Sequence, residues 1–334
     1  MVDRILVAGG AGFIGSHVCK ALAAAGFLPV VFDDLSGGHR DAVRWGPLVV
    51  GDIRDAEALD RTFRQYRPQA VVHLAGFIAA GESVTDPQKY YDNNIGGTLA
   101  LLGGMRRHDI QSIVFSSSAA VYGDAQEMPI REGAAMGPSN PYGWTKAMTE
   151  VMLRDYAVYG LNSVSLRYFN AAGADPDGDI GELHEPETHL IPLILEAVAG
   201  LRPTIDIFGT DHPTPDGTCI RDYVHVEDLA QAHVLALRAL LEGRVEGAAA
   251  YNLGNGKGYS VHEVIAVVEA VTGRRVPARH KPARAGDPPR LVADSSEAER
   301  MLGWRQEYSD LESQIAHAWA FLRKRRPELM ESVG

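Results

Sequence analysis

Tyr142 and Lys146 are the residues whose types and spacing most directly suggest chemistry. They lie in the segment NPYGWTK (140–146), where Asn140 is a favoured helix N-cap and Pro141 is tolerated at the first helical position. Positions i and i+4 share one face of a helix, so the Tyr142 phenol and the Lys146 ammonium are expected to project toward one point. The spacing predicts either a proton-transfer pair or an ordinary surface pair, because YxxxK is common.

A phenol needs more than one nearby cation to act as a base near neutral pH. The unperturbed pKa of tyrosine is about 10, so a shift of ~3 units is required, or ~4 kcal/mol in favour of the phenolate. One nearby cation supplies about 1 to 3 units. Lys146 alone is therefore marginal, and a second positive group is expected at the site. Ser116, Ser117 and Ser118 end a predicted strand, and their hydroxyls are candidates to bridge to a substrate oxygen.

The segment GGAGFIGSH (9–17) supplies a candidate for that second group. It fits two glycine templates, GxGxxG at Gly10, Gly12 and Gly15 and GxxGxxG at Gly9, Gly12 and Gly15. Glycines at a strand-to-helix turn permit a tight turn and let a pyrophosphate approach the backbone, while the helix N-terminus offers N–H donors. The segment predicts a dinucleotide site, whose oxidised nicotinamide ring carries a positive charge; a merely tight turn is the alternative.

Carboxylates at the ends of the next two predicted strands support the dinucleotide interpretation. Asp33 and Asp34 end the second strand, and Asp33 falls 18 residues after Gly15, close to the roughly 20 expected for a ribose-binding acid. Because a carboxylate there would repel a 2′-phosphate, NAD is expected rather than NADP. Asp52 and Ile53 end the third strand and are placed for an adenine ring, although Asp52 could equally cap the next helix.

Short apolar runs recur along the first half of the chain and alternate with helical patterns. The runs are RILVAGG (4–10), PVVFDD (29–34), PLVVGD (47–52), AVVHLAG (70–76), SIVFSSS (112–118) and SVSLRYFN (163–170). The expected helices span 12–25, 56–66, 90–107, 142–159, 226–242 and 261–272. Continuous apolar strands alternating with helices predict an α/β fold with a doubly wound, Rossmann-like parallel sheet.

The character of the sequence changes near Asn170. Residues 170–190 are dense in Gly, Pro and Asp, which favours a long loop, and loops of this length are usually functional or disordered. We expect residues 1–169 to form an NAD-binding domain, with about 225–254 returning to it. Residues 170–334 are then expected to form a smaller mixed α/β substrate domain.

Composition excludes several function classes. The 334 residues include 32 Lys and Arg against 43 Asp and Glu, and a formal net charge of -11 would repel a nucleic acid. Two cysteines support neither a disulfide framework nor a Cys-based metal site, and no metal is expected. No signal peptide or membrane-length apolar run is visible, so we expect a cytoplasmic protein without a membrane partner.

Six motifs taken together resemble a known family. They are GGAGFIGSH (9–17), YYDNNIGGT (90–98), SSSAAVYG (116–123), PYGWTK (141–146), RYFNAAGADPDGDIGE (167–182) and DGTCIRDYVHVEDLA (216–230). The chain resembles the extended short-chain dehydrogenase/reductase family and, within it, the UDP-hexose 4-epimerases. The resemblance runs from Val2 to about Trp304, and the last two motifs are far more specific than the glycines.

The resemblance implies an isomerase that keeps NAD bound and interconverts UDP-glucose and UDP-galactose. Tyr142 would be the base that takes the proton of the sugar 4-hydroxyl, Lys146 its electrostatic partner and a ribose ligand, and Ser118 a hydrogen-bonding helper. Hydride would leave sugar C4 for the nicotinamide and return to the other face after the 4-keto sugar turns. The implied cofactor-binding residues are Gly9, Gly12, Phe13, Ile14, Gly15, Asp33, Asp34, Asp52, Ile53, Leu74, Ala75, Gly76, Asn94, Ser116, Tyr142, Lys146, Tyr168 and Phe169.

The same resemblance assigns a nucleotide-sugar site to the second half of the chain. Arg221 and Arg284 are expected to bind the diphosphate, since guanidinium suits phosphate geometry. The implied substrate-binding residues are Ser118, Tyr142, Asn170, His189, Leu190, Phe208, Arg221, Tyr223, Arg284, Asp287 and Leu291. Three positions depart from the pattern of some members: Ile78 replaces a phosphate-binding lysine, His189 a uridine-binding asparagine, and Leu291 is intermediate where residue size gates the sugar.

Other functions stay open at this point. A 4-epimerase of another nucleotide sugar, such as a UDP-N-acetylhexosamine or a UDP-pentose, fits the same motifs. A 4,6-dehydratase would be expected to carry an Asp–Glu pair where Ser118, Ala119 and Ala120 stand. A non-catalytic NAD sensor is permitted by the fold alone but has no use for a tuned base. The resemblance also implies a homodimer formed through helices 90–107 and 142–159.

Overall fold

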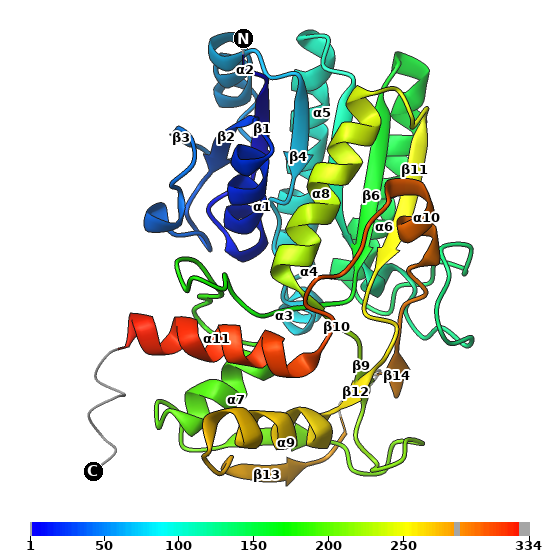
Figure 1. The fold of residues 1–334 in the computed structure, drawn as a ribbon. Coiled ribbons are helices and arrows are strands. Elements are labelled where there is room, and N and C mark those ends of the chain that lie inside the picture. Colours follow the sequence, from blue (N-terminus) through cyan, green and yellow to red (C-terminus); the bar gives the residue numbers. More distant parts are fainter. Residues whose placement is uncertain (1, 284–287, 327–334) are drawn as a thin grey trace.

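A seven-stranded parallel sheet forms the larger part of the molecule (Figure 1). The computed structural model describes residues 2–283 and 288–326. The strand order is β11-β6-β5-β4-β1-β2-β3, so the connection reverses direction between β1 and β4. The strands are β1 (Arg4–Ala8), β2 (Leu28–Asp33), β3 (Leu48–Val50), β4 (Ala70–His73), β5 (Ser112–Ser118), β6 (Asn162–Tyr168) and β11 (Ala248–Leu253). This confirms the predicted doubly wound sheet, and β11 is the segment that returns to it.

Helices cover both faces of the sheet (Figure 1). Alternate residues of a strand point to opposite faces, so Ile5 and Val7 pack with α1 and α8, while Leu6 and Ala8 pack with α2 and α5. Both faces are apolar, as the continuous apolar runs predict. The helices on the sheet are α1 (Phe13–Ala24), α2 (Ala56–Tyr66), α5 (Gly97–Arg107), α6 (Pro141–Asp155) and α8 (Val226–Leu241).

The helix expected over 90–107 is divided in three. It consists of α4 (Pro87–Tyr90), the π-helical segment η2 (Tyr91–Gly96) and α5. A π-turn carries an extra residue, and here it directs Asn93 and Asn94 into the protein interior. The helix expected over 142–159 is α6 followed by a short 3₁₀ turn, η4 (Tyr156–Tyr159), and it stops where Gly160 takes a positive φ of 83°.

A smaller lobe lies at the carboxyl end of the sheet strands (Figure 1). Its core is formed by Ile194, Val264 and Ile315 with their neighbours. Its helices are α7 (Leu190–Val198), α9 (Val261–Thr272) and α11 (Leu311–Arg325). Its strands are β7 (Asn170–Ala172), β8 (Ile205–Phe208), β9 (Ile220–Arg221), β10 (Tyr223–His225), β12 (Tyr259–Ser260), β13 (Ala278–Lys281) and β14 (Arg290–Leu291).

The remaining elements are short connections. They are η1 (Arg40–Ala42), α3 (Ala80–Thr85), η3 (Ala119–Val121) and α10 (Ser296–Leu302). The segment expected to be a loop is irregular from the end of β7 to the start of α7. None of the helices within 2–283 and 288–326 is both long and apolar enough to cross a membrane.

Candidate active site

The start of α6 places Tyr142 and Lys146 against the carboxyl end of β5. The side-chain oxygen of Asn140 accepts a hydrogen bond from the Gly143 amide at 2.9 Å, and Pro141 is the first helical residue, which confirms the predicted helix start. Lys146 is buried, and its Nζ donates to the backbone carbonyl of Ser116 at 2.7 Å. The same Nζ lies 5.8 Å from the centre of the Tyr142 ring.

The electrostatics of the pair differ from the simplest expectation. Burial raises the pKa of Tyr142, and a hydrogen bond with Ser118 opposes that rise only in part. Burial also lowers the pKa of Lys146 to about 8, against the attraction of Glu150. The net effect of burial is that the pKa of the phenol lies above its ordinary value, although the Lys146 Nζ is 5.8 Å from the ring centre. A second positive charge is therefore needed even more than the spacing alone predicts.

Glu150 is a residue that sequence reasoning missed. Its carboxylate is buried and forms an ion pair with Arg167 of β6 at 2.5 Å, and Ser117 of β5 donates a hydrogen bond to it at 2.5 Å. These contacts tie α6 to two neighbouring strands and so hold Lys146 in place. A signal was present, since positions 142, 146 and 150 repeat every four residues along one helix face.

Asn94 occupies a bridging position. Its side-chain oxygen accepts from the Phe77 amide at 2.9 Å, and its nitrogen donates to the Phe77 carbonyl and to the Thr145 hydroxyl, each at 3.1 Å. The Thr145 hydroxyl in turn donates to the Tyr142 carbonyl at 2.7 Å. All of these contacts are with protein groups, so Asn94 joins the loop after β4 to the first turn of α6.

The glycine turn is shaped by close backbone approaches. Gly9 has φ +83°, and a Cβ on it would lie 2.5 Å from the Ala75 nitrogen. A Cβ on Gly15 would lie 2.1 Å from the Gly9 carbonyl oxygen, so both positions admit only glycine. A Cβ on Gly12 would meet nothing nearer than 3.6 Å, which leaves open space at the N-cap of α1. That space lies where the dinucleotide templates put a pyrophosphate.

The residues around this turn lie where the sequence predicts. Leu74, Ala75 and Gly76 continue β4 beside Gly9, and the amides of Leu74 and Ala75 both donate to the Ala8 carbonyl. Phe13 is buried in the first turn of α1, and Ile14 is half-buried. Ser116 of β5 and Tyr168 of the neighbouring β6 are hydrogen-bonded through their hydroxyls. Five predicted cofactor residues thus flank the turn, and two lie near Lys146.

The predicted acidic residues have partners within the protein. Asp33 is buried and accepts from the amides of Ala11 and Leu35, each at 2.9 Å, so it braces the glycine turn. Asp34 is exposed and accepts from Ser36. Each carboxylate retains at least one lone pair for a ribose hydroxyl, since both bonds to Asp34 use its Oδ1 and leave its Oδ2 available.

Asp52 does not cap the following helix. Arg54 binds its carboxylate through the guanidinium at 2.6 Å and holds its pKa below the ordinary value. The N-cap of α2 is Asp55, whose side chain accepts from the amides of Glu57 and Ala58. Ile53 is buried against Gly97 of α5, where an added Cβ would lie 2.4 Å from its side chain.

Strand pairing in the smaller lobe brings several predicted substrate residues together. Tyr223 of β10 lies opposite Asn170 of β7 in a parallel pair. Arg221 of β9 lies between Leu291 of β14 and Tyr259 of β12 in the three-stranded sheet. Leu291 also packs with Phe169 on the small apolar cluster that contains Ala147 of α6. The chain thus carries Arg221 and Leu291 back to the helix that bears Tyr142.

The other predicted substrate residues are more widely spread. His189 is the N-cap residue of α7, and Leu190 is its first residue. Phe208 ends β8, which pairs with β13 at the far side of the smaller lobe. Arg284 and Asp287 lie outside the described residues. Ile78, which stands where some members carry a lysine, is exposed.

Asp222 is a buried carboxylate directly after Arg221. It is fully buried, and its carboxylate accepts from the amides of Asn255, Gly256 and Ala293. It thereby fastens two later segments beside Arg221. Its partners lie 33 to 71 residues away, so spacing along the chain could not have found them.

Comparison with known proteins agrees with this arrangement. Residues 5–254 match the NAD dependent epimerase/dehydratase family. The UDP-glucose 4-epimerase of Azospirillum brasilense is 51% identical over 333 residues, which cover 99% of this chain and 94% of the relative. The crystal structure of UDP-glucose 4-epimerase from Brucella ovis in complex with NAD has a TM-score of 0.92 at 53% identity, covering 95% of this chain and 98% of that one.

A third relative was crystallised with both NAD and a UDP-sugar. It is UDP-glucose-4-epimerase from Stenotrophomonas maltophila with bound NAD and formylated UDP-arabinopyranose, with a TM-score of 0.93 at 41% identity, covering 98% of this chain and 99% of that one. The family match spans most of the chain, and the relatives align with it over nearly their whole length. This chain therefore belongs to the NAD-dependent epimerase/dehydratase family, among its UDP-glucose 4-epimerases.

Proposed function

We propose that this chain interconverts UDP-glucose and UDP-galactose as an NAD-dependent 4-epimerase in which Tyr142 is the base. The observation that carries the assignment of Tyr142 is that α6 holds it and Lys146 at the carboxyl end of the same sheet whose first strand ends in the glycine turn. A dinucleotide lying across that edge would bring its nicotinamide toward Tyr142. Ligands of open α/β sheets bind at this edge, at the reversal of strand order.

The residues present fit NAD. Gly12 leaves open space at the N-terminus of α1, where backbone amides and the helix dipole suit a pyrophosphate. Asp33 and Asp34 would hold the adenosine ribose, and Lys146 the nicotinamide ribose. Bound NAD would supply the acceptor and then the donor of the hydride at sugar C4, together with the positive charge that the phenol needs.

The protein groups would move one proton and hold the sugar. The Tyr142 phenolate takes the proton of the 4-hydroxyl and gives it back to the same oxygen, so no net oxidation occurs. Ser118, which is hydrogen-bonded to Tyr142, would bond the same sugar oxygen. Lys146 stabilises the phenolate, and Arg221 would hold the diphosphate while the sugar turns.

The purified chain with UDP-galactose, followed by NMR of the sugar protons, tests this function. We expect UDP-glucose to accumulate to a constant ratio without added oxidant, because hydride returns to the sugar it left. A chain that carries NAD and yields no UDP-glucose would overturn the proposal. A nucleotide sugar without a free 4-hydroxyl is the matched control and should give no product.

A 4-epimerase of another UDP-sugar is the second candidate. What favours it is Leu291, a residue of intermediate size that packs beside Phe169 where sugar size is expected to be gated. The Stenotrophomonas relative was crystallised with a UDP-pentose derivative. The ratio of kcat/KM for UDP-galactose, UDP-N-acetylgalactosamine and a UDP-pentose separates the two candidates.

The glycine turn gives a paired prediction about the cofactor. Gly12→Ala is expected to fold normally, because the added Cβ meets no atom within 3.6 Å and the φ of Gly12 is -80°. The same Cβ would fill the pyrophosphate space, so we expect it to weaken NAD binding by about tenfold or more. Gly15→Ala is expected to unfold more easily, because its Cβ collides with the Gly9 carbonyl. Bound NAD and the midpoint of urea unfolding measure the two effects. Gly81→Ala, at a site with no atom within 4 Å of the added Cβ, is the control. A Gly12→Ala protein with wild-type NAD affinity would contradict the assignment.

We also propose that two copies pair through α5 and α6. Leu99 on α5 and Trp144 and Met148 on α6 are between 41% and 47% exposed, so the two predicted helices share an apolar outer face. Met148→Glu is expected to halve the mass in light scattering, because a carboxylate would be buried at the contact. Met301→Glu, equally exposed at 41% but on α10, is the control. A monomeric wild-type protein would end this proposal.

The assignment of NAD and UDP-sugar binding to separate parts of the chain also stays a proposal. Residues 1–169 with about 225–254 would bind NAD, and the remainder of 170–334 would bind the UDP-sugar. What supports it is that α8 and β11 lie on the seven-stranded sheet. The cytoplasmic location likewise stays a prediction, which a fluorescent fusion would test.

A further inference from the structure

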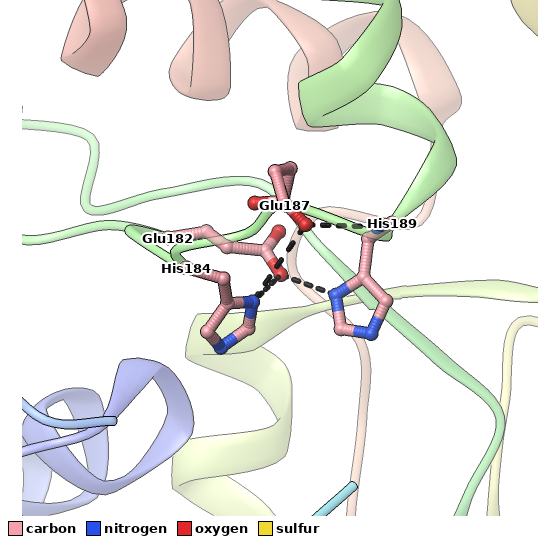
Figure 2. A group of neighbouring side chains, drawn as sticks. All are labelled: Glu182, His184, Glu187 and His189. Atoms are coloured by element: carbon pink, nitrogen blue, oxygen red, sulfur yellow. Dashed lines mark hydrogen bonds and ion pairs between the residues drawn. The ribbon is translucent and has the colours of Figure 1, made fainter. Parts of the chain in front are cut away.

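The loop before α7 gathers two histidines and two glutamates in eight residues. Glu182, His184, Glu187 and His189 each turn one donor atom inward, and these four atoms lie within 4.8 Å of one another (Figure 2). Among the described residues it is the one such group of three or more His, Cys, Asp or Glu. The proposed epimerase reaction makes no use of Glu182, His184 or Glu187.

The donor spacing suits a tetrahedral metal ion. Zn²⁺ binds histidine nitrogen and carboxylate oxygen at roughly 2.0 to 2.2 Å, which puts two ligands of one ion roughly 3.3 to 3.6 Å apart. Nδ1 of His184 lies 3.1 Å from Oε1 of Glu182 and 3.7 Å from Oε1 of Glu187. Nδ1 of His189 is hydrogen-bonded to the same Glu182 oxygen, a contact that would open by a side-chain rotation to admit the ion.

The acidic members of the cluster are buried and held in place by their neighbours. Nδ1 of His184 is fully covered and lies within ion-pair distance of both carboxylates. The Glu182 and Glu187 side chains are only 6% and 5% exposed. Glu187 is itself oriented, because its Oε1 accepts from the amides of Thr188 and His189. Oriented, buried carboxylates are typical of metal ligands held by their neighbours.

We propose that Glu182, His184, Glu187 and His189 form a binding site for one Zn²⁺ ion. The donor set of two imidazoles and two carboxylates, without a thiolate, suits Zn²⁺ better than Mg²⁺ or Ca²⁺, which take oxygen ligands. This proposal departs from the expectation of no metal, which rested on the cysteines and not on this loop. The spacing E-x-H-x-x-E-x-H was visible in the sequence.

The position of the site gives the ion a fastening role. Between its ligands, the Leu183 carbonyl contacts Nε2 of His39 at 2.9 Å, and the His39 amide donates to the Ala11 carbonyl of the glycine turn. At the other end His189 begins α7, with its Nε2 directed away from the cluster (Figure 2). The ion would therefore fix the loop 182–189, which joins the glycine turn to the smaller lobe.

Metal content of the tag-free, full-length chain tests the site. The protein is stripped with a chelator, given one equivalent of ZnCl₂ or CoCl₂, and dialysed against metal-free buffer. We expect about one Zn²⁺ per chain and, with Co²⁺, the intense visible bands of a tetrahedral ion. His184→Gln and Glu187→Gln are each expected to weaken Zn²⁺ binding by about 100-fold or more, since even the loss of an outer partner costs 10- to 100-fold.

Zn²⁺ binding and melting temperature are also measured for a control variant. His280→Gln, on an exposed strand far from the loop in sequence, should bind Zn²⁺ as the wild type does. Zn²⁺ should raise the melting temperature of the wild type and of His280→Gln, but not of the two ligand variants. A wild type that stays metal-free, or that binds Ca²⁺ or Mg²⁺ instead, would leave only an ion-pair cluster. Such a result overturns the site without touching the epimerase proposal, which NMR of UDP-galactose tests separately.

Discussion

Tyr142→Phe is expected to lower kcat for 4-epimerisation by about 10³-fold while leaving NAD bound. General acid–base groups contribute roughly 10² to 10⁴-fold, and the substitution removes the oxygen that carries the proton. The ring stays, so the packing around the start of α6 should persist. Steady-state turnover of UDP-galactose and the NAD released on denaturation measure the two halves of this result.

The comparison with a distant tyrosine makes that prediction specific. Tyr66→Phe removes the same hydroxyl at the end of α2, and it should leave both turnover and bound NAD unchanged. If Tyr142→Phe retained more than a tenth of wild-type kcat, another group would have to take the proton. A variant that lost NAD as well would point to a structural role for the hydroxyl instead.

Lys146→Met is expected to be nearly inactive and yet more stable than the wild type. Loss of one electrostatic group at a reacting centre costs roughly 10² to 10³-fold in kcat. Burial lowers the pKa of Lys146 from 10.5 to about 8, which means that folding disfavours the ammonium. Removing the ammonium should raise the free energy of unfolding at pH 7 by about 1 to 3 kcal/mol. Each unit of the pKa shift is worth about 1.4 kcal/mol, and the lost hydrogen bond to Ser116 offsets part of that gain.

The change of stability with pH also tests whether folding disfavours the Lys146 ammonium. Between about pH 8 and 10.5 the unfolded wild-type chain holds a proton on Lys146 that the folded chain has released. Stability from this group therefore rises with pH across that window, and Lys146→Met should lack the rise. Urea unfolding at pH 7, 8, 9 and 10 measures it, and Lys257→Met, at an exposed lysine, should keep the wild-type slope. An unchanged slope in Lys146→Met would contradict this account of the buried ammonium.

The elements that the sequence predicts well are those determined by neighbouring residues. Five of the first six strands are apolar runs covered on both faces, the exception being the partly exposed edge strand β3, and Asn140 with Pro141 marks a helix start that needs no distant partner. The glycines of the first turn are required by contacts within a few residues, such as that between Gly15 and Gly9. Local chemistry of this kind is legible in a single sequence.

What the sequence does not reveal depends on contacts between distant segments. Asp222 accepts three amides that lie 33 to 71 residues away, and Glu150 pairs with an arginine on another element. The direction of the Tyr142 pKa shift was also hidden, because it follows from the burial of the phenol. The π-turn at Asn94 serves a side chain that must reach both Phe77 and Thr145, and helical periodicity gives no sign of it.

The position of β11 at the edge of the sheet determines where the chain can be truncated. This strand begins 80 residues after the end of β6, with which it pairs, and the intervening chain builds much of the smaller lobe. A fragment ending at residue 169 would leave the backbone of β6 as an unprotected border, open to joining the strands of other copies. The two lobes are thus interwoven, and we expect that neither half folds as an independent module.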